Sequence, residues 1–512
     1  MQPIDYDIRE QILNEKANIA ISASAGTGKT YTTVQKIAKE LNENKDYRTF
    51  AAITFTRKAA KEIEQRLGVN KNDGFVGTND NFVLREIIQP FMYDVYGRDY
   101  KKDIIPDYSN ENMFMEFDDG ISKIKDSQLI CKYSDNHKNF AFQLALDILK
   151  QSKAARRYIN SKYYRIYVDE YQDSDKDMHN LFMYICKTIN VPLFIVGDIK
   201  QSIYGWRGGY VDGFKEVLAD TKNFNIFKLK QNFRSNKPIQ NYSNLFMDDV
   251  RENYQLVEVN DKIQMFTYNK ISEIVSVIKS WIKNSQNCAF LVRKNDVASS
   301  FNKLLINNGI DFTYLPSSPL DNSNLESEHI WIARILAFYL LQDRFSEYDV
   351  LSEIPSSDSF DYNKIKRILK NVKKNKKEYK LFEDSCIKLY TYLGYVSSEK
   401  IEKEIKQLFN VISDERYIPT YNPKNYDHII TTIHSSKGLE YKQVIILTED
   451  YNLLNENDKY LHYVAVSRPE ERLLILNRVN NKNMYNKVLE DNIKNLNKIG
   501  FKVSREHILK DL

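Results

Sequence analysis

The stretch that most constrains the fold of this chain is Ile21–Thr33, a short apolar run followed by a loop with two glycines and the start of a helical pattern. Glycine accepts left-handed backbone angles, so such a loop can turn with its N–H groups pointing inward, beside the positive end of the following helix. The pattern therefore predicts a polyphosphate cradle. Aligned to G-x-x-x-x-G-K-[ST], with alanine at the first glycine position, its residues are Ala23, Ser24, Ala25, Gly26, Thr27, Gly28, Lys29 and Thr30.

Two side chains at the end of the cradle indicate what it does with the phosphates. Lys29 can reach the β- and γ-phosphates as a point charge. The Thr30 hydroxyl is a suitable ligand for an Mg²⁺ ion that bridges the same oxygens. A chance match in an ordinary loop is the alternative, and the motifs that follow argue against it.

A pair of carboxylates follows a second apolar strand, expected over residues 164–168. Two adjacent carboxylates after such a strand are costly unless a cation or a water molecule uses them. Asp169 suits the Mg²⁺ shell, and Glu170 suits the base that orients an attacking water. The alternative is a solvated acidic turn, which the preceding cradle disfavours.

Aromatic and basic residues near further strands indicate nucleic-acid contacts. The expected strand 192–196 leads into a glycine-flanked loop with Trp206 beside Arg207, a pair typical of a site that stacks on bases and contacts phosphates. Phe55, after the expected strand 50–54, can stack on a base, although a core phenylalanine is the alternative. Periodicity also predicts strands at 288–292 and 444–447 and helices over 34–41, 60–67, 178–185 and 297–305, the last ended by Gly309.

Length and composition limit the classes of protein to consider. At 512 residues the chain is too long for one compact core and should divide into several domains. Its net charge of +5 gives no global electrostatic case for nucleic acid, so any basic track must be local. The four cysteines have no zinc-site spacing and predict buried free thiols, and no apolar run approaches the ~20 residues of a membrane span. We expect a cytoplasmic protein without membrane contact.

Seven sequence blocks, in order from Gln11 to Arg468, resemble the superfamily 1 helicases of the UvrD/Rep type. Besides those above, they include QNFRS at 231–235, TIHSSKGLE at 432–440 and YVAVSR at 463–468. The resemblance implies an α/β fold with two RecA-like P-loop NTPase domains, each with a parallel sheet interrupted by a mainly helical insertion. The expected domains are 1A (1–84 and 145–227, ATP-binding), 1B (85–144, helical insertion), 2A (228–355 and 421–512) and 2B (356–420, a reduced helical insertion).

The resemblance also implies a role for each matched position. Catalysis would rest on Lys29, Asp169, Glu170 and the γ-phosphate sensor Gln201, with Arg234 and Arg468 as paired arginines that stabilise the departing phosphoryl group. The remaining nucleotide contacts would come from Gln11 on adenine, Phe233 stacked on the base and Glu440 on the ribose. The residues matched to DNA contacts are Phe55, Trp206, Arg207 and His434.

The chain departs from the family pattern at three places. Tyr31 follows the cradle where relatives usually have arginine, so the adenine would lie between Tyr31 and Phe233, two rings without a cation. Residues 77–82 lack the histidine that a family block normally places on DNA. The second insertion is small and basic over residues 364–380, which predicts a solvated face or a surface for DNA or a partner.

Residues 142–208 resemble most closely the UvrD-like helicase subunits of the Gabija anti-phage defence systems. This resemblance implies a 3′–5′ DNA-dependent ATPase and helicase that uses Mg²⁺ with ATP or another NTP and acts on DNA with single-stranded regions or ends. It also implies a hetero-oligomer with a separate nuclease subunit carrying ATPase and toprim domains. The alternatives are a DNA-end-activated NTPase that signals without processive unwinding and a nucleotide-dependent scaffold for the nuclease. Only 44 residues follow Arg468, so we expect no nuclease domain in this chain.

Overall fold

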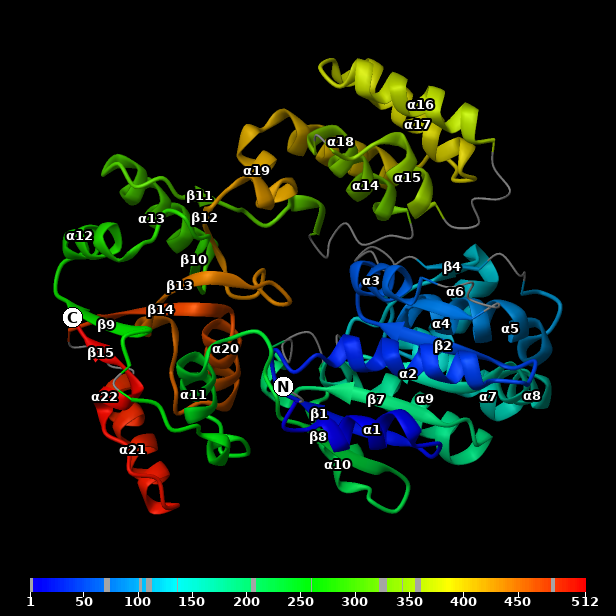
Figure 1. Ribbon diagram of the computed structural model, residues 1–512. Coiled ribbons are helices and arrows are strands. Elements are labelled where there is room, and N and C mark those ends of the chain that lie inside the picture. The colour runs from blue at the N-terminus through cyan, green and yellow to red at the C-terminus, as the bar shows by residue number, and fades with distance from the viewer. Residues whose placement is uncertain are drawn as a thin grey trace. The chain divides into compact units, whose positions relative to one another are not determined.

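The computed structural model describes residues 3–68, 74–100, 104–106, 113–135, 137–203, 209–258, 260–321, 329–342, 344–354, 361–479 and 484–512 (Figure 1). The chain forms two compact units. The first contains Met1–Ile105, Phe114–Thr267 and Leu447–Leu512, and the second contains Pro106–Met113 and Tyr268–Ile446. The expected division into 1A, 1B, 2A and 2B stays a prediction.

The first unit contains a six-stranded sheet in the order β3-β2-β6-β7-β1-β8, and every neighbouring pair in it is parallel. Ile21 of β1 lies opposite Val196 of β7, and Ile53 of β2 lies opposite Val168 of β6. The carboxyl ends of these strands therefore share one edge. The strands are β1 (Ile19–Ala23), β2 (Thr49–Thr54), β3 (Phe75–Thr78), β6 (Tyr163–Val168), β7 (Leu193–Gly197) and β8 (Asn225–Leu229).

Helices cover both faces of this sheet, as expected for parallel strands that are buried on each side. On one face Ile12, Ile37 and Ile63, from the first three helices, pack with Phe194 in one apolar cluster. On the other face Phe214 of α10 lies against Gly197. The helices up to this point are α1 (Tyr6–Asn14), α2 (Lys29–Glu43), α3 (Arg57–Leu67), α4 (Asn79–Val83), α5 (Gln89–Tyr96), α6 (Phe117–Ser127), α7 (Phe140–Gln151), α8 (Lys153–Lys162), α9 (Lys176–Tyr184) and α10 (Val211–Ala219).

A buried charge network anchors the start of the chain to this sheet. Glu40 of α2 accepts from Arg165 Nε at 2.9 Å and from the Tyr167 hydroxyl, and it pairs with Lys36 Nζ at 2.9 Å. Lys36 and Arg165 also donate to backbone carbonyls within residues 13–17. Because each buried charge has partners, the network is satisfied, and it fixes the turn between α1 and β1.

A second sheet has seven strands in the order β11-β12-β10-β13-β14-β9-β15. Cys288 of β10 lies opposite His428 of β12 and Gln443 of β13, and both pairings are parallel. The strands are β9 (Ile263–Tyr268), β10 (Cys288–Val292), β11 (Thr313–Tyr314), β12 (His428–Thr432), β13 (Tyr441–Leu447), β14 (Pro469–Arg478) and β15 (Lys510–Asp511).

The later helices of the first unit enclose an aromatic cluster around a buried histidine. The His462 ring lies 4.6 Å from the Phe246 ring and 5.0 Å from the Tyr451 ring, centroid to centroid, and its Nε2 lies 2.7 Å from the Tyr485 hydroxyl. Burial lowers the pKa of His462 to about 3, so the ring is neutral at physiological pH. These helices are α11 (Lys237–Leu245), α20 (Glu456–Val466), α21 (Tyr485–Lys498) and α22 (Arg505–Ile508).

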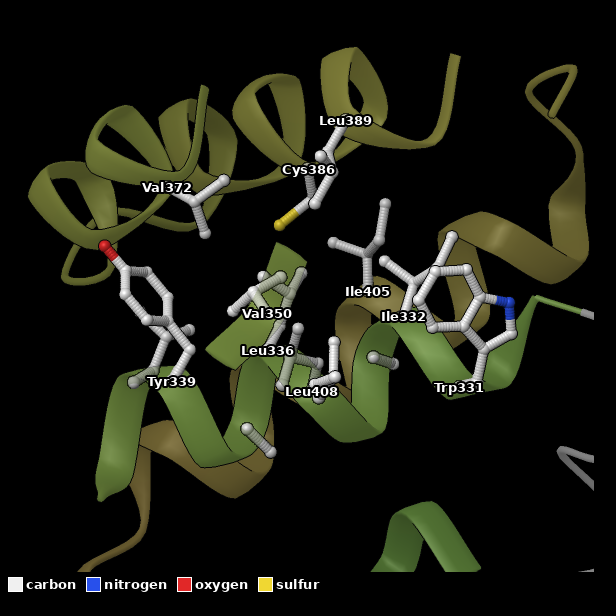
Figure 2. Close-up of a cluster of buried hydrophobic side chains, with 14 of the residues drawn as sticks. Trp331, Ile332, Leu336, Tyr339, Val350, Val372, Cys386, Leu389, Ile405 and Leu408 are labelled. Carbon is white, nitrogen blue, oxygen red and sulfur yellow. The ribbon is translucent and has the colours of Figure 1, made fainter. Parts of the chain in front are cut away.

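The second unit has a helical part with its own apolar core, which Figure 2 shows. Leu336 of α14, Cys386 and Leu389 of α17, and Ile405 and Leu408 of α18 point into this core. The core also includes residues of α14 and α15, so it extends beyond residues 356–420. The helices of the unit are α12 (Ile271–Trp281), α13 (Asn295–Asn307), α14 (Ile330–Leu341), α15 (Glu347–Glu353), α16 (Tyr362–Asn375), α17 (Tyr379–Tyr392), α18 (Glu399–Ser413) and α19 (Ile418–Tyr421).

The secondary structure expected from periodicity is confirmed in most places. The five expected strands correspond to β2, β6, β7, β10 and β13, and the four expected helices to α2, α3, α9 and α13. All four cysteines are buried and free. Within residues 85–144, expected as a helical insertion, β4 (Ile105–Pro106) pairs with β5 (Leu129–Ile130). No helix within the described ranges is long and apolar enough to cross a membrane.

Candidate functional site

The cradle lies at the carboxyl edge of the first sheet, between β1 and α2. Gly26 has φ +74° and Gly28 has φ +78°, the left-handed region in which glycine is unstrained. Thr27 closes the loop by donating its hydroxyl to the Ser24 carbonyl at 2.8 Å. Lys29 and Thr30 begin α2 directly after Gly28, so the loop meets the positive end of a helix of 15 residues.

Asp169 and Glu170 follow β6 at the same edge. Lys29 Nζ lies 3.7 Å from Glu170 Oε1, which brings together the two side chains expected to act on the γ-phosphate and on water. Glu170 has φ +51°, a left-handed angle that costs free energy for a residue other than glycine and that clusters at functional sites. The structure thus holds this carboxylate in a strained position beside the cradle.

The electrostatics of Asp169 suit a cation. Burial raises the pKa of Asp169 to about 7, and Glu170 adds to the rise while Lys29 opposes it. The described residues hold no group of three or more His, Cys, Asp or Glu side chains that could bind a metal by themselves. Mg²⁺ usually takes only one or two carboxylates and completes its shell with water and phosphate oxygens. Asp169 with Thr30 therefore fits Mg²⁺ bound together with a nucleotide.

Gln172 connects the ends of β6 and β7, a role that the sequence analysis did not assign. Its side chain is fully buried, donates to the Glu170 carboxylate and accepts from the Asp198 N–H at 2.9 Å. Gln201, the expected γ-phosphate sensor, donates to Asp198 Oδ2 at 2.7 Å. Glu170 and Gln201 are therefore linked through Gln172 and Asp198.

A tyrosine of α20 connects the cradle to the loop after β7. The Ala25 N–H donates to the Tyr463 hydroxyl at 3.2 Å. Lys200 Nζ lies 5.6 Å from the centre of the same tyrosine ring and 2.8 Å from Asp198 Oδ1. The block YVAVSR thus reaches the cradle through its first residue.

The segment after β8 is bonded directly to the cradle. Asn232 donates its side-chain amide to the Ala25 carbonyl at 3.0 Å, and the Phe233 N–H donates to the Gly26 carbonyl at 2.9 Å. A Cβ atom on Gly26 would lie 2.5 Å from Asn232 Oδ1, so only glycine fits where the two loops meet. This contact brings the segment that carries Arg234 to the phosphate loop.

The segments that carry the two expected arginines also meet each other. The Ser235 hydroxyl donates to the Pro469 carbonyl at 2.7 Å, and these two residues directly follow Arg234 and Arg468. Arg468 is buried and donates through Nε to the Val464 carbonyl at 2.8 Å. The structure thus places Arg234 and Arg468 on adjoining backbone segments, both bonded to the cradle region.

The mouth of the cradle has two exposed aromatic rings and a cation that the sequence analysis missed. Tyr31 is 58% exposed and Phe233 is 59% exposed. We expected these rings without a cation, but the Arg9 guanidinium of α1 lies 5.1 Å from the centre of the Phe233 ring. Gln11, which we expected to contact adenine, is exposed. It lies two residues after Arg9 in α1, and side chains two residues apart on a helix point in different directions. One feature of the sequence could have drawn attention to Arg9: Asp5 lies four residues earlier, and the two side chains form an ion pair.

The other residues expected to contact DNA or the ribose lie on several separate segments. Phe55 is half-buried in the turn between β2 and α3 of the first unit. His434, half-buried, and Glu440, exposed, belong to the segment between β12 and β13 in the second unit. Trp206 and Arg207 lie outside the described residues.

Comparison with known proteins finds three family models that match parts of the chain. Residues 8–207 match the family model described as AAA domain, residues 227–319 the UvrD-like helicase C-terminal domain, and residues 357–477 the viral superfamily 1 RNA helicase core domain. The chain is 39% identical to Gabija protein GajB of Bacillus cereus (strain VD045) over 495 residues, covering 96% of this chain and 97% of that protein.

More distant relatives are DNA helicases. DNA helicase II of Rickettsia typhi is 22% identical, with 95% of this chain and 93% of that protein covered. ATP-dependent DNA helicase PcrA of Staphylococcus epidermidis is 23% identical, with coverage of 91% and 82%. The chain is thus an ATP-dependent DNA helicase, and it belongs to the UvrD-like helicases of superfamily 1, in the family of Gabija protein GajB.

Proposed function

We propose that this chain hydrolyses ATP, or another NTP, with Mg²⁺ in the cradle, and that DNA with single-stranded regions or ends stimulates the hydrolysis. The observation that supports this proposal most is the convergence on one sheet edge of Lys29, Glu170 and the segment bearing Arg234. A phosphate-binding cation, a base for water and a charge-stabilising arginine are the side chains that phosphoryl transfer to water requires.

Each side chain has a separate task in this proposal. The cradle N–H groups and Lys29 bind the phosphates, and Glu170 orients the attacking water. Arg234 and Arg468 stabilise the negative charge that grows on the transferred group. Asp169 and Thr30 hold Mg²⁺, which supplies Lewis-acid charge neutralisation at the phosphate oxygens when it is bound. Gln201, hydrogen-bonded to Asp198, senses the γ-phosphate.

We further propose that hydrolysis drives movement along a DNA strand in the 3′–5′ direction, with Phe55, Trp206, Arg207 and His434 in contact with the strand. Family membership supports the helicase activity, and the direction follows from the resemblance alone. Two other functions compete with processive unwinding. In one, DNA ends activate an NTPase that signals without unwinding; in the other, nucleotide binding alone organises a scaffold.

The relative that is 39% identical to this chain is named Gabija protein GajB. We propose on this basis that the chain serves a cytoplasmic anti-phage defence complex as its helicase, together with a separate nuclease subunit of the ATPase and toprim type. The test is co-purification of a tagged chain from its native operon, followed by a nuclease assay on each fraction. Nuclease activity that stays with the isolated chain and disappears on a point change in it would contradict the division of labour.

The catalytic proposal is tested by Lys29→Ala, with Lys39→Ala as the matched control on the same helix. Lys39 lies near Glu43 on the far end of α2 and takes no part in the cradle. We expect Lys29→Ala to abolish DNA-stimulated phosphate release and Lys39→Ala to retain it. Hydrolysis at the normal rate in Lys29→Ala would overturn the assignment of the cradle.

A strand-displacement assay beside the hydrolysis assay separates the three functions. A helicase displaces a labelled strand only while it hydrolyses ATP. A signalling NTPase hydrolyses with DNA ends but displaces nothing. A scaffold binds nucleotide and partner without turnover, so its function survives Glu170→Gln.

A further inference from the structure

Two of the side chains at the mouth of the cradle, Tyr31 and Phe233, are unusually exposed. Each leaves more than half of its surface exposed, whereas neighbouring rings such as those of Tyr171 and Tyr463 are buried. Both rings adjoin the cradle: Tyr31 follows Thr30 in α2, and the Phe233 N–H donates to the Gly26 carbonyl. Exposed flat rings beside a phosphate loop leave room for a flat ligand group.

Arg9 is held against the Phe233 ring by four hydrogen bonds. Its Nε and one terminal nitrogen donate to the two carboxylate oxygens of Asp5 at 2.8 and 3.1 Å. The terminal nitrogens also donate to the Thr27 carbonyl at 2.9 Å and to the Thr32 hydroxyl at 3.0 Å. The side chain is only 12% exposed, so the guanidinium is fixed before any ligand arrives.

Asp5 is fixed in turn by the segment after β8. It is 2% exposed and accepts from the backbone N–H groups of Lys230 and Gln231 at 2.9 and 3.1 Å. Burial disfavours its charge, but Arg9 and these N–H groups outweigh the burial, and the pKa of Asp5 lies below its ordinary value. The ion pair therefore joins α1, the cradle and the segment that carries Phe233.

We propose that Arg9 is the cation of the nucleobase site, a binding residue that presents the face and edge of its guanidinium to the base of the bound nucleotide beside Phe233. This inference rests on the proposed function, since it takes the phosphates to lie in the cradle. A guanidinium stacks on flat rings and donates through its edge, whereas Lys at the same place keeps the charge but loses the plane.

The position of Arg9 beside Gly28 supports contact with a nucleotide rather than a purely structural task. A Cβ atom on Gly28 would lie 3.9 Å from an Arg9 terminal nitrogen and 3.8 Å from Tyr31 Cβ. Arg9, Tyr31 and Phe233 thus surround the same stretch of cradle from three elements. A nucleotide whose triphosphate follows the cradle N–H groups leaves its base at this mouth.

The experiment compares a ligand that has a base with one that has none. For the wild type and Arg9→Ala, KM and kcat for ATP hydrolysis are measured with saturating single-stranded DNA, together with the inhibition constant of inorganic tripolyphosphate. We expect Arg9→Ala to raise KM for ATP about tenfold with kcat within about twofold, as the loss of one stacked cation predicts. The inhibition constant of tripolyphosphate should change less than about twofold, because the cradle is intact.

Two further variants complete the test. Arg9→Lys should restore only part of the affinity for ATP, because lysine cannot stack its charge as a plane. Glu10→Ala, a change at an exposed residue on the same helix, should leave both constants unchanged. A parallel loss of ATP and tripolyphosphate affinity in Arg9→Ala and Arg9→Lys would show that Arg9 only shapes the cradle and would overturn the inference.

Failure of the underlying function gives a different result. Lys29→Ala should weaken tripolyphosphate and ATP alike, and an unchanged inhibition constant in that variant would place the phosphates elsewhere. An unchanged KM for ATP in Arg9→Ala, with Lys29→Ala impaired, would leave the phosphate site standing and remove Arg9 from it.

Discussion

The carboxyl edge of the first sheet and the helical core of the second unit are stabilised in opposite ways. The edge contains left-handed glycines, a strained Glu170 and buried polar side chains such as Gln172. The helical core of Figure 2 is built almost entirely from apolar side chains on amphipathic helices. The sheet edge therefore contains strained and polar residues that reduce stability but suit a reaction. The helical core contributes stability and has no proposed part in the reaction.

This contrast predicts that substitutions separate activity from stability. A change at the edge should reduce turnover with little loss of folding free energy. A change in the helical core should reduce folding free energy while the molecules that remain folded still turn over. The following predictions test this separation, beginning with the largest expected effect.

Glu170→Gln should lower the hydrolysis rate about 10³-fold, because an amide cannot act as the base for water. Stability should change little, because the change removes both the repulsion between Glu170 and Asp169 and the attraction between Glu170 and Lys29. The measurements are single-turnover hydrolysis and the thermal unfolding midpoint. Normal hydrolysis by this variant, or an unfolding midpoint well below that of the wild type, would contradict the separation of activity from stability.

Leu389→Ala, in the helical core, should destabilise the second unit by about 3 kcal/mol through the cavity that it leaves. The matched control is Leu381→Ala on the same helix, α17, where the side chain is 45% exposed and the cost should stay within about 0.5 kcal/mol. Hydrogen exchange of peptides from α14 to α18 reports both values. Equal effects of the two changes would contradict the assigned core.

Gln172→Ala should show both effects at once, because this buried side chain holds Glu170 and the end of β7 together. Leaving the Asp198 N–H and the Glu170 carboxylate without their partner should cost about 2 kcal/mol. Hydrolysis should fall about tenfold, as Glu170 loses its positioning contact. Chemical denaturation and steady-state hydrolysis measure the pair. Loss of only one property would show that the two roles are separable.

His462 predicts the smallest effect, which depends on pH. Its folded pKa of about 3 lies below the ordinary value, 6.5, so the unfolded chain binds the proton first and stability falls as the pH drops below about 6.5. Between pH 7 and 5.5 the wild type should lose about 1 kcal/mol more than His462→Phe, which keeps an aromatic ring without titration. Urea unfolding of both at the two pH values measures the difference; identical slopes would rule out a neutral buried imidazole.

Much of the fold could be predicted from local sequence. The strands β2, β6, β7, β10 and β13 are buried apolar runs, and such runs are recognisable because nearly every residue is apolar. β8 was not predicted. It is an edge strand of its sheet and only partly buried, so its sequence NIFKL mixes polar and apolar residues. Edge strands carry a weaker pattern than central ones.

The site shows a similar division between local and distant information. Gly26, Lys29 and Glu170 belong to contiguous motifs, and their spacing alone indicates phosphate chemistry. Arg9 and Gln172 act through contacts with distant segments, so their roles depend on which face of α1 or which end of β7 comes near. The local pair of Asp5 and Arg9 does not show which distant segments approach it, so only the tertiary structure reveals these contacts.

The contact between Asn232 and the cradle has a consequence for how this sequence can change. The side chain donates to the Ala25 carbonyl, while its oxygen accepts from the N–H groups of Arg234 and Ser235 at 2.8 and 3.0 Å and lies against Gly26. Aspartate in place of Asn232 would have the same length but no N–H donor. Glutamine would keep the donor and the acceptor but on a longer side chain. A substitution at position 232 or at position 26 therefore disturbs the same contact, and a tolerated change at one position requires a compensating change at the other to keep the segment of Arg234 against the phosphate loop.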